Sequence, residues 1–139
     1  MKKLKILIID DDVDYVETLK IVLKEAQYAV TTASNKTEGM EKIVKEKPAL
    51  IILDAMMSTW RDGFEMSREL KNHPKFKQIP ILMLTSISET TGVEFKSSAG
   101  NPTWLPVDGF LEKPVNTEIL LSEIERLLQK KSQNDADNG

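Results

Sequence analysis

Residues 6–14 read ILIIDDDVD, so four apolar residues run directly into three consecutive aspartates, Asp10, Asp11 and Asp12. The apolar run predicts a buried strand over residues 4–9. Adjacent like charges repel one another and destabilise a fold unless a cation lies among them. The stretch therefore predicts a strand whose end holds a positively charged partner.

Four further apolar segments read as strands. Residues 49–53 (ALIIL) and 79–84 (IPILML) are apolar at every position, as expected of central strands that are covered on both faces. Residues 28–33 (YAVTTA) and 109–113 (GFLEK) are more mixed and suit the edges of a sheet. Together with residues 4–9, they predict a sheet of five strands.

Helical periodicity separates these strands, over residues 14–27, 35–47, 63–73 and 117–131. Asp12, Asn35 and Asn116 precede three of the helical segments and can cap them, Asn35 as part of a capping box. Residues 1–131 are expected to form one domain, and the polar tail 132–139 is expected to be disordered.

The alternation of strands and helices predicts an α/β fold with a parallel sheet and helices on both faces. With the mixed strands at the edges, the strand order is 2-1-3-4-5, which is the flavodoxin-like, doubly wound arrangement. A fourth helix would fall within residues 86–108, but glycines and prolines interrupt this segment and it has no clean apolar stripe. We therefore expect an atypical fourth-helix region.

Composition excludes several classes of site. The 139 residues carry a formal net charge of −3 with a pI near 5.3, so no general attraction to nucleic acid or to an anionic membrane is expected. There is no cysteine and only one histidine, His73, which excludes disulfides, thiolate zinc sites and two-histidine motifs. Any metal must be a hard cation held by oxygen. No signal peptide or membrane span is recognisable, so a soluble, cytoplasmic protein is expected.

Polar groups follow four strands that are expected to be neighbours. Asp10 and Asp11 follow the first strand, Asp54 the third, Thr85 the fourth, and Lys113 ends the fifth. Ligands of open α/β sheets bind beyond the carboxyl ends of the strands, so these groups should converge. Three carboxylates suit Mg²⁺, and a lysine with a hydroxyl suits phosphate oxygens.

The pieces IIDDD, LIILDAMM, PILMLTS and FLEKP occur in this order, and over about residues 4–130 the chain resembles the receiver domain of two-component response regulators. The likeness is to a stand-alone, chemotaxis-regulator-like receiver. It implies that Asp54 is the phosphoacceptor. It also implies that Mg²⁺ is bound by Asp10, Asp11, Asp54 and the backbone carbonyl of Met56.

The resemblance implies further roles around the phosphoryl group. Lys113 would bind phosphate, before a cis-proline at Pro114. Thr85 would be the switch hydroxyl, and Phe110 falls at the aromatic switch position of the last strand. Asp12 has no implied metal role and is better read as a helix cap.

Two departures from the family pattern stand out. The segment AMMSTWRDG carries Ser58 where receivers usually have a proline, and one extra residue precedes Asp62–Gly63. The stretch from Thr85 to Lys113 is several residues longer than usual. The surface around residues 86–112 is therefore expected to differ from that of typical receivers.

The implied function is that of a phosphoacceptor response regulator in a two-component or phosphorelay pathway, not a conventional enzyme. A sensor histidine kinase or phosphotransfer protein would phosphorylate Asp54, and the protein would catalyse this uptake and a slow autodephosphorylation. No effector domain is expected after the last helix, so the expected output is a downstream protein partner or a homodimer, without direct contact to nucleic acid or membrane. Apolar Met56 and Ile87 would flank the phosphoryl group and slow its hydrolysis.

Three alternatives remain open. A haloacid-dehalogenase-like phosphatase needs Asp-x-Asp-x-Thr/Val, but Asp14 stands at the last position and the chain is short for that fold. A flavodoxin needs a Ser/Thr/Gly-rich phosphate loop where this chain has carboxylates. A degenerate receiver that serves only for docking would lack site residues, whereas all of them are present here.

Overall fold

The computed structural model describes residues 3–54, 60–85 and 107–138. Within these ranges only the backbone is described for residues 60–62, 64, 85 and 131–138. The expected fourth-helix region lies outside the described residues, apart from Val107 and Asp108.

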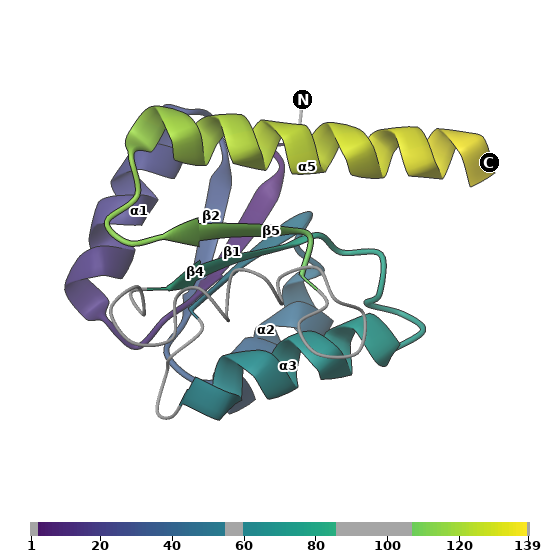
Figure 1. The fold of residues 1–139 in the computed structure, drawn as a ribbon, viewed down its shortest axis with the longest axis horizontal. Helices are drawn as coiled ribbons and strands as arrows, with labels where there is room; N and C mark the ends of the chain where they lie inside the picture. The colour runs from purple at the N-terminus through teal and green to yellow at the C-terminus, as the bar shows by residue number, and fades with distance from the viewer. Residues whose placement is uncertain (1–2, 55–59, 86–106, 139) are drawn as a thin grey trace.

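A parallel sheet of five strands in the order β2-β1-β3-β4-β5 forms the centre of the fold (Figure 1). Its strands are β1 (Lys5–Ile9), β2 (Ala29–Ala33), β3 (Leu50–Asp54), β4 (Ile81–Thr85) and β5 (Gly109–Glu112). The pairing is parallel throughout, for example with Ile9 opposite Leu53 between β1 and β3. The predicted flavodoxin-like strand order is confirmed.

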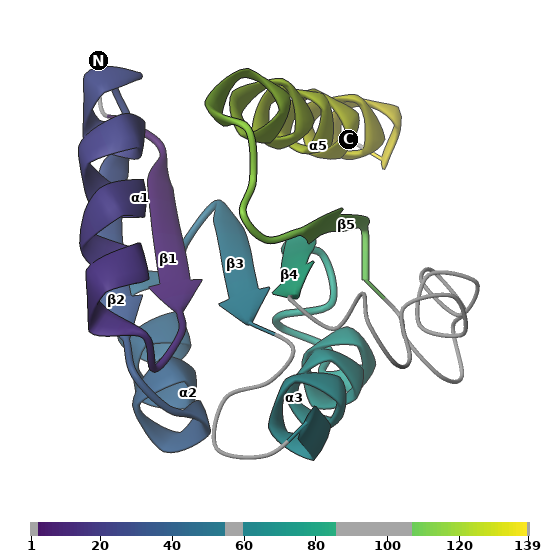
Figure 2. The ribbon, with the colours of Figure 1, turned by 60° about the vertical axis from the view of Figure 1, so that its left-hand side comes forward.

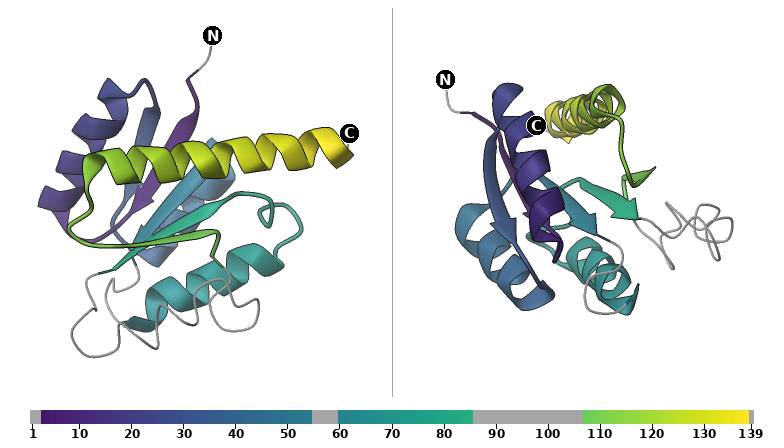
Figure 3. Two further views of the ribbon diagram at one scale, coloured as in Figure 1. Left: turned by 45° about the horizontal axis from the view of Figure 1, so that its top comes forward. Right: turned by 90° about the vertical axis from the view of Figure 1, so that its left-hand side faces the viewer.

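Helices cover both faces of the sheet, as Figure 2 and the right-hand view of Figure 3 show. They are α1 (Val13–Glu25), α2 (Lys36–Glu46), α3 (Trp60–Asn72) and α5 (Thr117–Asn138). Helices α1 and α5 lie on one face, and α2 and α3 lie on the other. The helix α3 begins three residues before its predicted start.

The two faces are packed by alternate residues of the same strands. Ile6 and Ile8 of β1 belong to the cluster that contains the apolar side chains of α1 and α5, whereas Leu7 and Ile9 belong to the cluster with α2 and α3. All four side chains are fully buried. Successive side chains of a strand point to opposite faces, so a strand covered on both sides is apolar at every position. This is the physical reason for the unbroken apolar runs.

Polar side chains cap the N-termini of three helices, as predicted. Asp12 accepts a hydrogen bond from the Tyr15 amide at 3.1 Å, and Asn35 accepts one from the Glu38 amide at 2.8 Å. Asn116 accepts hydrogen bonds from the two amides at positions 118 and 119. Each cap satisfies donors that have no partner within the helix.

Gly39 in α2 has a packing role that offsets its low helix propensity. A Cβ atom at this position would lie 2.8 Å from Cδ1 of Ile9 and 3.0 Å from Cε of Met66. Glycine therefore allows α2 to approach the sheet closely, next to the strand whose end carries Asp10.

The structure differs from the expectation for the C-terminal segment, because α5 continues beyond residue 131 to Asn138. The tail expected to be disordered is helical over most of its length. Extending an existing helix adds one hydrogen bond per ordered residue, and neither proline nor glycine occurs between residues 132 and 138. The extension projects beyond the sheet (Figures 1 and 3). In the described part of the chain, no helix has the length and apolar composition needed to cross a bilayer.

Candidate metal and phosphoacceptor site

Three aspartates converge where β1 and β3 end. Asp10 follows β1 and is 4% exposed, Asp54 ends β3 and is 6% exposed, and Asp11 is exposed to solvent. Each contributes one carboxylate oxygen to a set in which all oxygens lie within 4.8 Å of one another. Because β1 and β3 are paired neighbours, their carboxyl ends bring these side chains together, as predicted.

Lys113 reaches the same cluster from the end of β5. Its ammonium donates a hydrogen bond to Oδ2 of Asp10 at 2.7 Å and lies 3.7 Å from Oδ1 of Asp54. The peptide bond between Lys113 and Pro114 is cis, as the family resemblance implied. The other oxygen of Asp10, Oδ1, accepts the Asp12 amide at 2.9 Å, so both oxygens of this buried carboxylate are held.

The charge of Lys113 is favoured by its surroundings. Burial opposes the charged form, but the hydrogen bond to Asp10 and the charges of Asp54 and Asp10 outweigh it and raise the pKa of Lys113. A raised pKa in the folded state means that the contribution of Lys113 to stability is fully present below its unfolded value near 10.5 and is lost as pH rises through the folded value. The ammonium is therefore charged at neutral pH.

The donor set suits a hard divalent cation. It consists of three carboxylates, and among the described residues the one cation paired with them, Lys113, does not balance their charge. Mg²⁺ prefers one or a few carboxylates together with water and phosphate oxygens, and it does not need nitrogen or sulfur ligands. Asp12 is not part of the cluster and caps α1 instead. Met56 lies outside the described residues, so its carbonyl ligand stays a prediction.

Mg²⁺ is expected to stabilise the fold, because it binds a carboxylate cluster that forms only when the strands are paired. At ten times its dissociation constant it should add about 1.4 kcal/mol to the free energy of unfolding. For a domain of this size that raises the melting temperature by about 4 °C. Thermal melts with MgCl₂, compared with NaCl of equal ionic strength, measure the effect.

The Asp11→Asn variant is the matched test, since Asp11 is exposed and its replacement leaves the core packing unchanged. We expect this variant to lose most of the Mg²⁺-dependent shift and to be no less stable without Mg²⁺. An equal shift in both proteins would contradict the metal site.

The two switch residues are placed only in part. Thr85 ends β4 opposite Glu112, and its side chain is outside the described residues. Phe110 is half-buried on β5 opposite Met83, and it packs against the core cluster on the α2 and α3 face. Phe110 thus lies on the other face of the sheet from α1 and α5. Its switch role stays a prediction.

Tyr15 is not among the predicted site residues, but the structure places its ring centroid 4.6 Å from the Lys113 ammonium. Its hydroxyl is buried, and among the described residues only the Val115 backbone faces it, without the geometry of a full hydrogen bond. Burial raises the pKa of Tyr15, and hydrogen bonding from the Val115 backbone and the charge of Lys113 offset this only in part. One signal in the sequence points to it, since Tyr15 lies one helical turn after the aspartates and next to inward-facing Val16.

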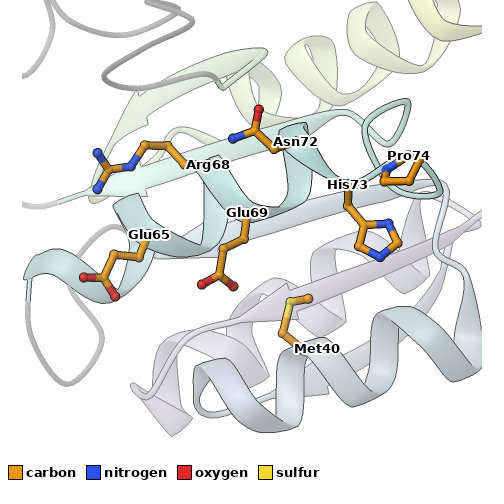
Figure 4. Close-up of a pocket in the computed structure, with 7 residues that line it drawn as sticks. All are labelled: Met40, Glu65, Arg68, Glu69, Asn72, His73 and Pro74. Carbon is orange, nitrogen blue, oxygen red and sulfur yellow. The ribbon is translucent and has the colours of Figure 1, made fainter.

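A separate hollow between α2 and α3 contains none of the predicted site residues (Figure 4). It is lined by Met40, Glu65, Arg68, Glu69, Asn72, His73 and Pro74. His73 stacks on Phe76 at a centroid distance of 4.3 Å, which accounts for its place there.

Comparison with known proteins agrees with this geometry. The sequence model of the response regulator receiver domain matches residues 6–125. The alkaline phosphatase synthesis transcriptional regulatory protein PhoP of Bacillus subtilis is 33% identical over 126 residues, which cover 91% of this chain and 49% of that protein.

Solved structures show the same fold. The signal receiver domain of a signal transduction histidine kinase from Syntrophus aciditrophicus has a TM-score of 0.77 and 32% identity, with 91% of this chain and 90% of that chain covered. The chemotaxis response regulator CheY4 of Vibrio cholerae has a TM-score of 0.75 and 29% identity, with coverages of 91% and 99%.

The chain belongs to the receiver domain family of two-component response regulators. Domains of this family accept a phosphoryl group, interact with histidine kinases or phosphotransfer proteins, and are not classical enzymes. The chain spans about half the length of the curated relatives it matches. The expectation of a stand-alone regulator therefore stays a prediction.

Proposed function

We propose that Asp54 is the phosphoacceptor, that Asp10, Asp11 and Asp54 hold Mg²⁺, and that Lys113 binds the phosphoryl group. The observation that carries this proposal is the bridging position of Lys113. Its ammonium lies within 4 Å of both buried carboxylates, at the edge of a three-carboxylate cluster. Three clustered carboxylates repel one another and destabilise the fold unless a further cation lies among them, which favours a metal-binding role over a purely structural one.

The chemistry is transfer of a phosphoryl group between two nucleophiles. A carboxylate oxygen of Asp54 donates an electron pair to phosphorus, and the bond from phosphorus to the donor histidine nitrogen breaks. The electron pair of that bond stays on the imidazole. When bound, Mg²⁺ supplies positive charge that neutralises the phosphoryl oxygens. Lys113 and the Thr85 hydroxyl bind the remaining oxygens, where charge is concentrated.

The proposed output is a change in a protein-interaction surface. Thr85 moves toward the phosphoryl group and Phe110 follows it inward. These movements shift the equilibrium between two conformations of the surface around residues 86–112. A sensor histidine kinase or phosphotransfer protein supplies the phosphoryl group, and a downstream protein or a second copy of the chain reads the surface. The half-buried position of Phe110 against the α2 and α3 layer supports this, because a side chain that is not yet fully buried can become more buried when the switch operates. The cytoplasmic location stays a prediction.

Incubation of the protein with acetyl phosphate tests the proposal without a partner kinase. We expect intact-mass spectrometry to show one added phosphoryl group when Mg²⁺ is present and none when EDTA replaces it. Hydroxylamine should remove the group, because it cleaves acyl phosphates and leaves phosphate esters of serine or threonine intact.

An adduct that resists hydroxylamine would place the phosphoryl group on a hydroxyl and contradict the proposal. The absence of any adduct would favour a receiver that serves only for docking.

A further inference from the structure

Tyr15 forms one side of the pocket around the Lys113 ammonium. It lies in the first turn of α1, and its ring packs against the apolar cluster between the sheet and the α1 and α5 layer. The ring centroid is 4.6 Å from the Lys113 nitrogen, within the range of a cation–π interaction. The Lys113 side chain is only 15% exposed, so little water competes for the ammonium.

We propose that Tyr15 is a positioning residue that keeps Lys113 at the acceptor when Asp10 no longer holds it. This inference rests on the proposed function. In the described structure the shortest contact of Lys113 is with Asp10, at 2.7 Å. The same carboxylate belongs to the metal cluster. A dication on Asp10 shares its negative charge and weakens its attraction for the ammonium.

The second carboxylate contact changes as well. Asp54 lies 3.7 Å from the ammonium, and phosphorylation moves the negative charge from its carboxylate to the phosphoryl oxygens, so this contact must be remade during the cycle. The aromatic face is the one described contact of the ammonium that neither metal binding nor phosphorylation uses. A long, flexible lysine side chain loses rotamer freedom when it is held in one place, so a fixed contact that persists through the cycle favours the productive position.

The ring face, and not the hydroxyl, is assigned this role. Among the described residues the Tyr15 hydroxyl makes no hydrogen bond to Lys113 or to the site carboxylates, and the group that faces it is the Val115 backbone, so the hydroxyl does not orient the ammonium. Tyr15→Phe therefore keeps the positioning contact, whereas Tyr15→Leu keeps apolar packing but removes the aromatic face. Comparison of Tyr15→Phe with Tyr15→Leu therefore distinguishes a role in positioning Lys113 from a role in packing the apolar core.

Nuclear magnetic resonance of the full chain reads the contact directly. Protons above an aromatic face shift upfield, so the ε-methylene protons of Lys113 should be upfield of those of exposed lysines, with and without Mg²⁺. The signal is assigned with Lys113→Met. We expect the shift to persist in Tyr15→Phe and to disappear in Tyr15→Leu. A normal Lys113 shift in the Mg²⁺-bound parent protein would overturn the proposal, and this measurement needs no variant of Tyr15.

The rate of phosphoryl uptake from acetyl phosphate at saturating Mg²⁺ gives the second readout. We expect it to fall about tenfold in Tyr15→Leu and by less than twofold in Tyr15→Phe. Equal rates in Tyr15→Leu and the parent protein, or equal losses in both variants, would refute the positioning role. If Asp54 takes up no phosphoryl group at all, the proposed function fails while the ring-current measurement still tests the contact.

Discussion

The Asp54→Asn variant is expected to show no phosphoryl adduct under conditions in which the parent protein is fully labelled by acetyl phosphate. An amide oxygen carries no negative charge and is a poor nucleophile, so we expect the rate to fall by at least about 100-fold. The fold should survive, because the substitution removes one of three mutually repelling carboxylates at a position that is 6% exposed. Intact-mass spectrometry measures the adduct, and a melt in EDTA checks the fold.

Asp12→Asn is the matched control for this experiment. It makes the same chemical change close to the site, but Asp12 caps α1 and asparagine caps helices as well as aspartate does. We expect this variant to be labelled like the parent protein. If Asp54→Asn gives as much phosphoryl adduct as the parent protein, another residue is the phosphoacceptor.

The Lys113→Met variant is expected to lose about 3 kcal/mol of unfolding free energy when no divalent cation is present. Methionine keeps most of the length of the side chain but leaves the buried carboxylates of Asp10 and Asp54 without their cation. Mg²⁺ should restore a large part of this loss, because it supplies positive charge to the same carboxylates. Phosphoryl uptake should also fall about 100-fold or more, since a group that stabilises the transferring phosphoryl oxygens is lost.

Urea unfolding in EDTA and in MgCl₂ measures the loss of unfolding free energy in Lys113→Met. The control variant is Lys71→Met. Lys71 is also mostly buried, and its ammonium lies 2.6 Å from Asp108 near the amino end of β5. Loss of this ion pair should destabilise the protein equally in both solutions. If Lys113→Met loses the same unfolding free energy in EDTA and in MgCl₂, Lys113 and the metal ion do not act on the same carboxylates.

The placement of the carboxylates could be predicted from the sequence because two simple rules apply to it. Strands that are apolar at every position are covered on both faces, so residues 49–53 and 79–84 had to be central. Residues that follow neighbouring parallel strands meet at one edge of the sheet, which brings Asp10 and Asp54 together. Lys113 followed from the same rule, although its exact contacts with the two carboxylates did not.

Other features depend on details that no periodic pattern carries. The contact between Tyr15 and Lys113 depends on how the first turn of α1 leaves the sheet and on two side-chain rotamers. The extension of α5 to Asn138 depends on helix propagation through a segment whose sequence carries no apolar stripe. The roles of Met56 and of the Thr85 hydroxyl fall outside what the structure describes and stay predictions.

The hydrogen bond between Lys113 and Asp10 joins residues 103 positions apart in the chain. Closing a contact of such large sequence separation costs more chain entropy than closing a local one. Chains are also synthesised from the N-terminus, so the three aspartates exist before the strand that supplies their lysine. A nascent or shortened chain that lacks β5 would present the carboxylates without the cation that binds the phosphoryl group. Acceptance of a signal would thus be restricted to molecules that have finished folding, and incomplete chains would not compete with them for the phosphoryl donor.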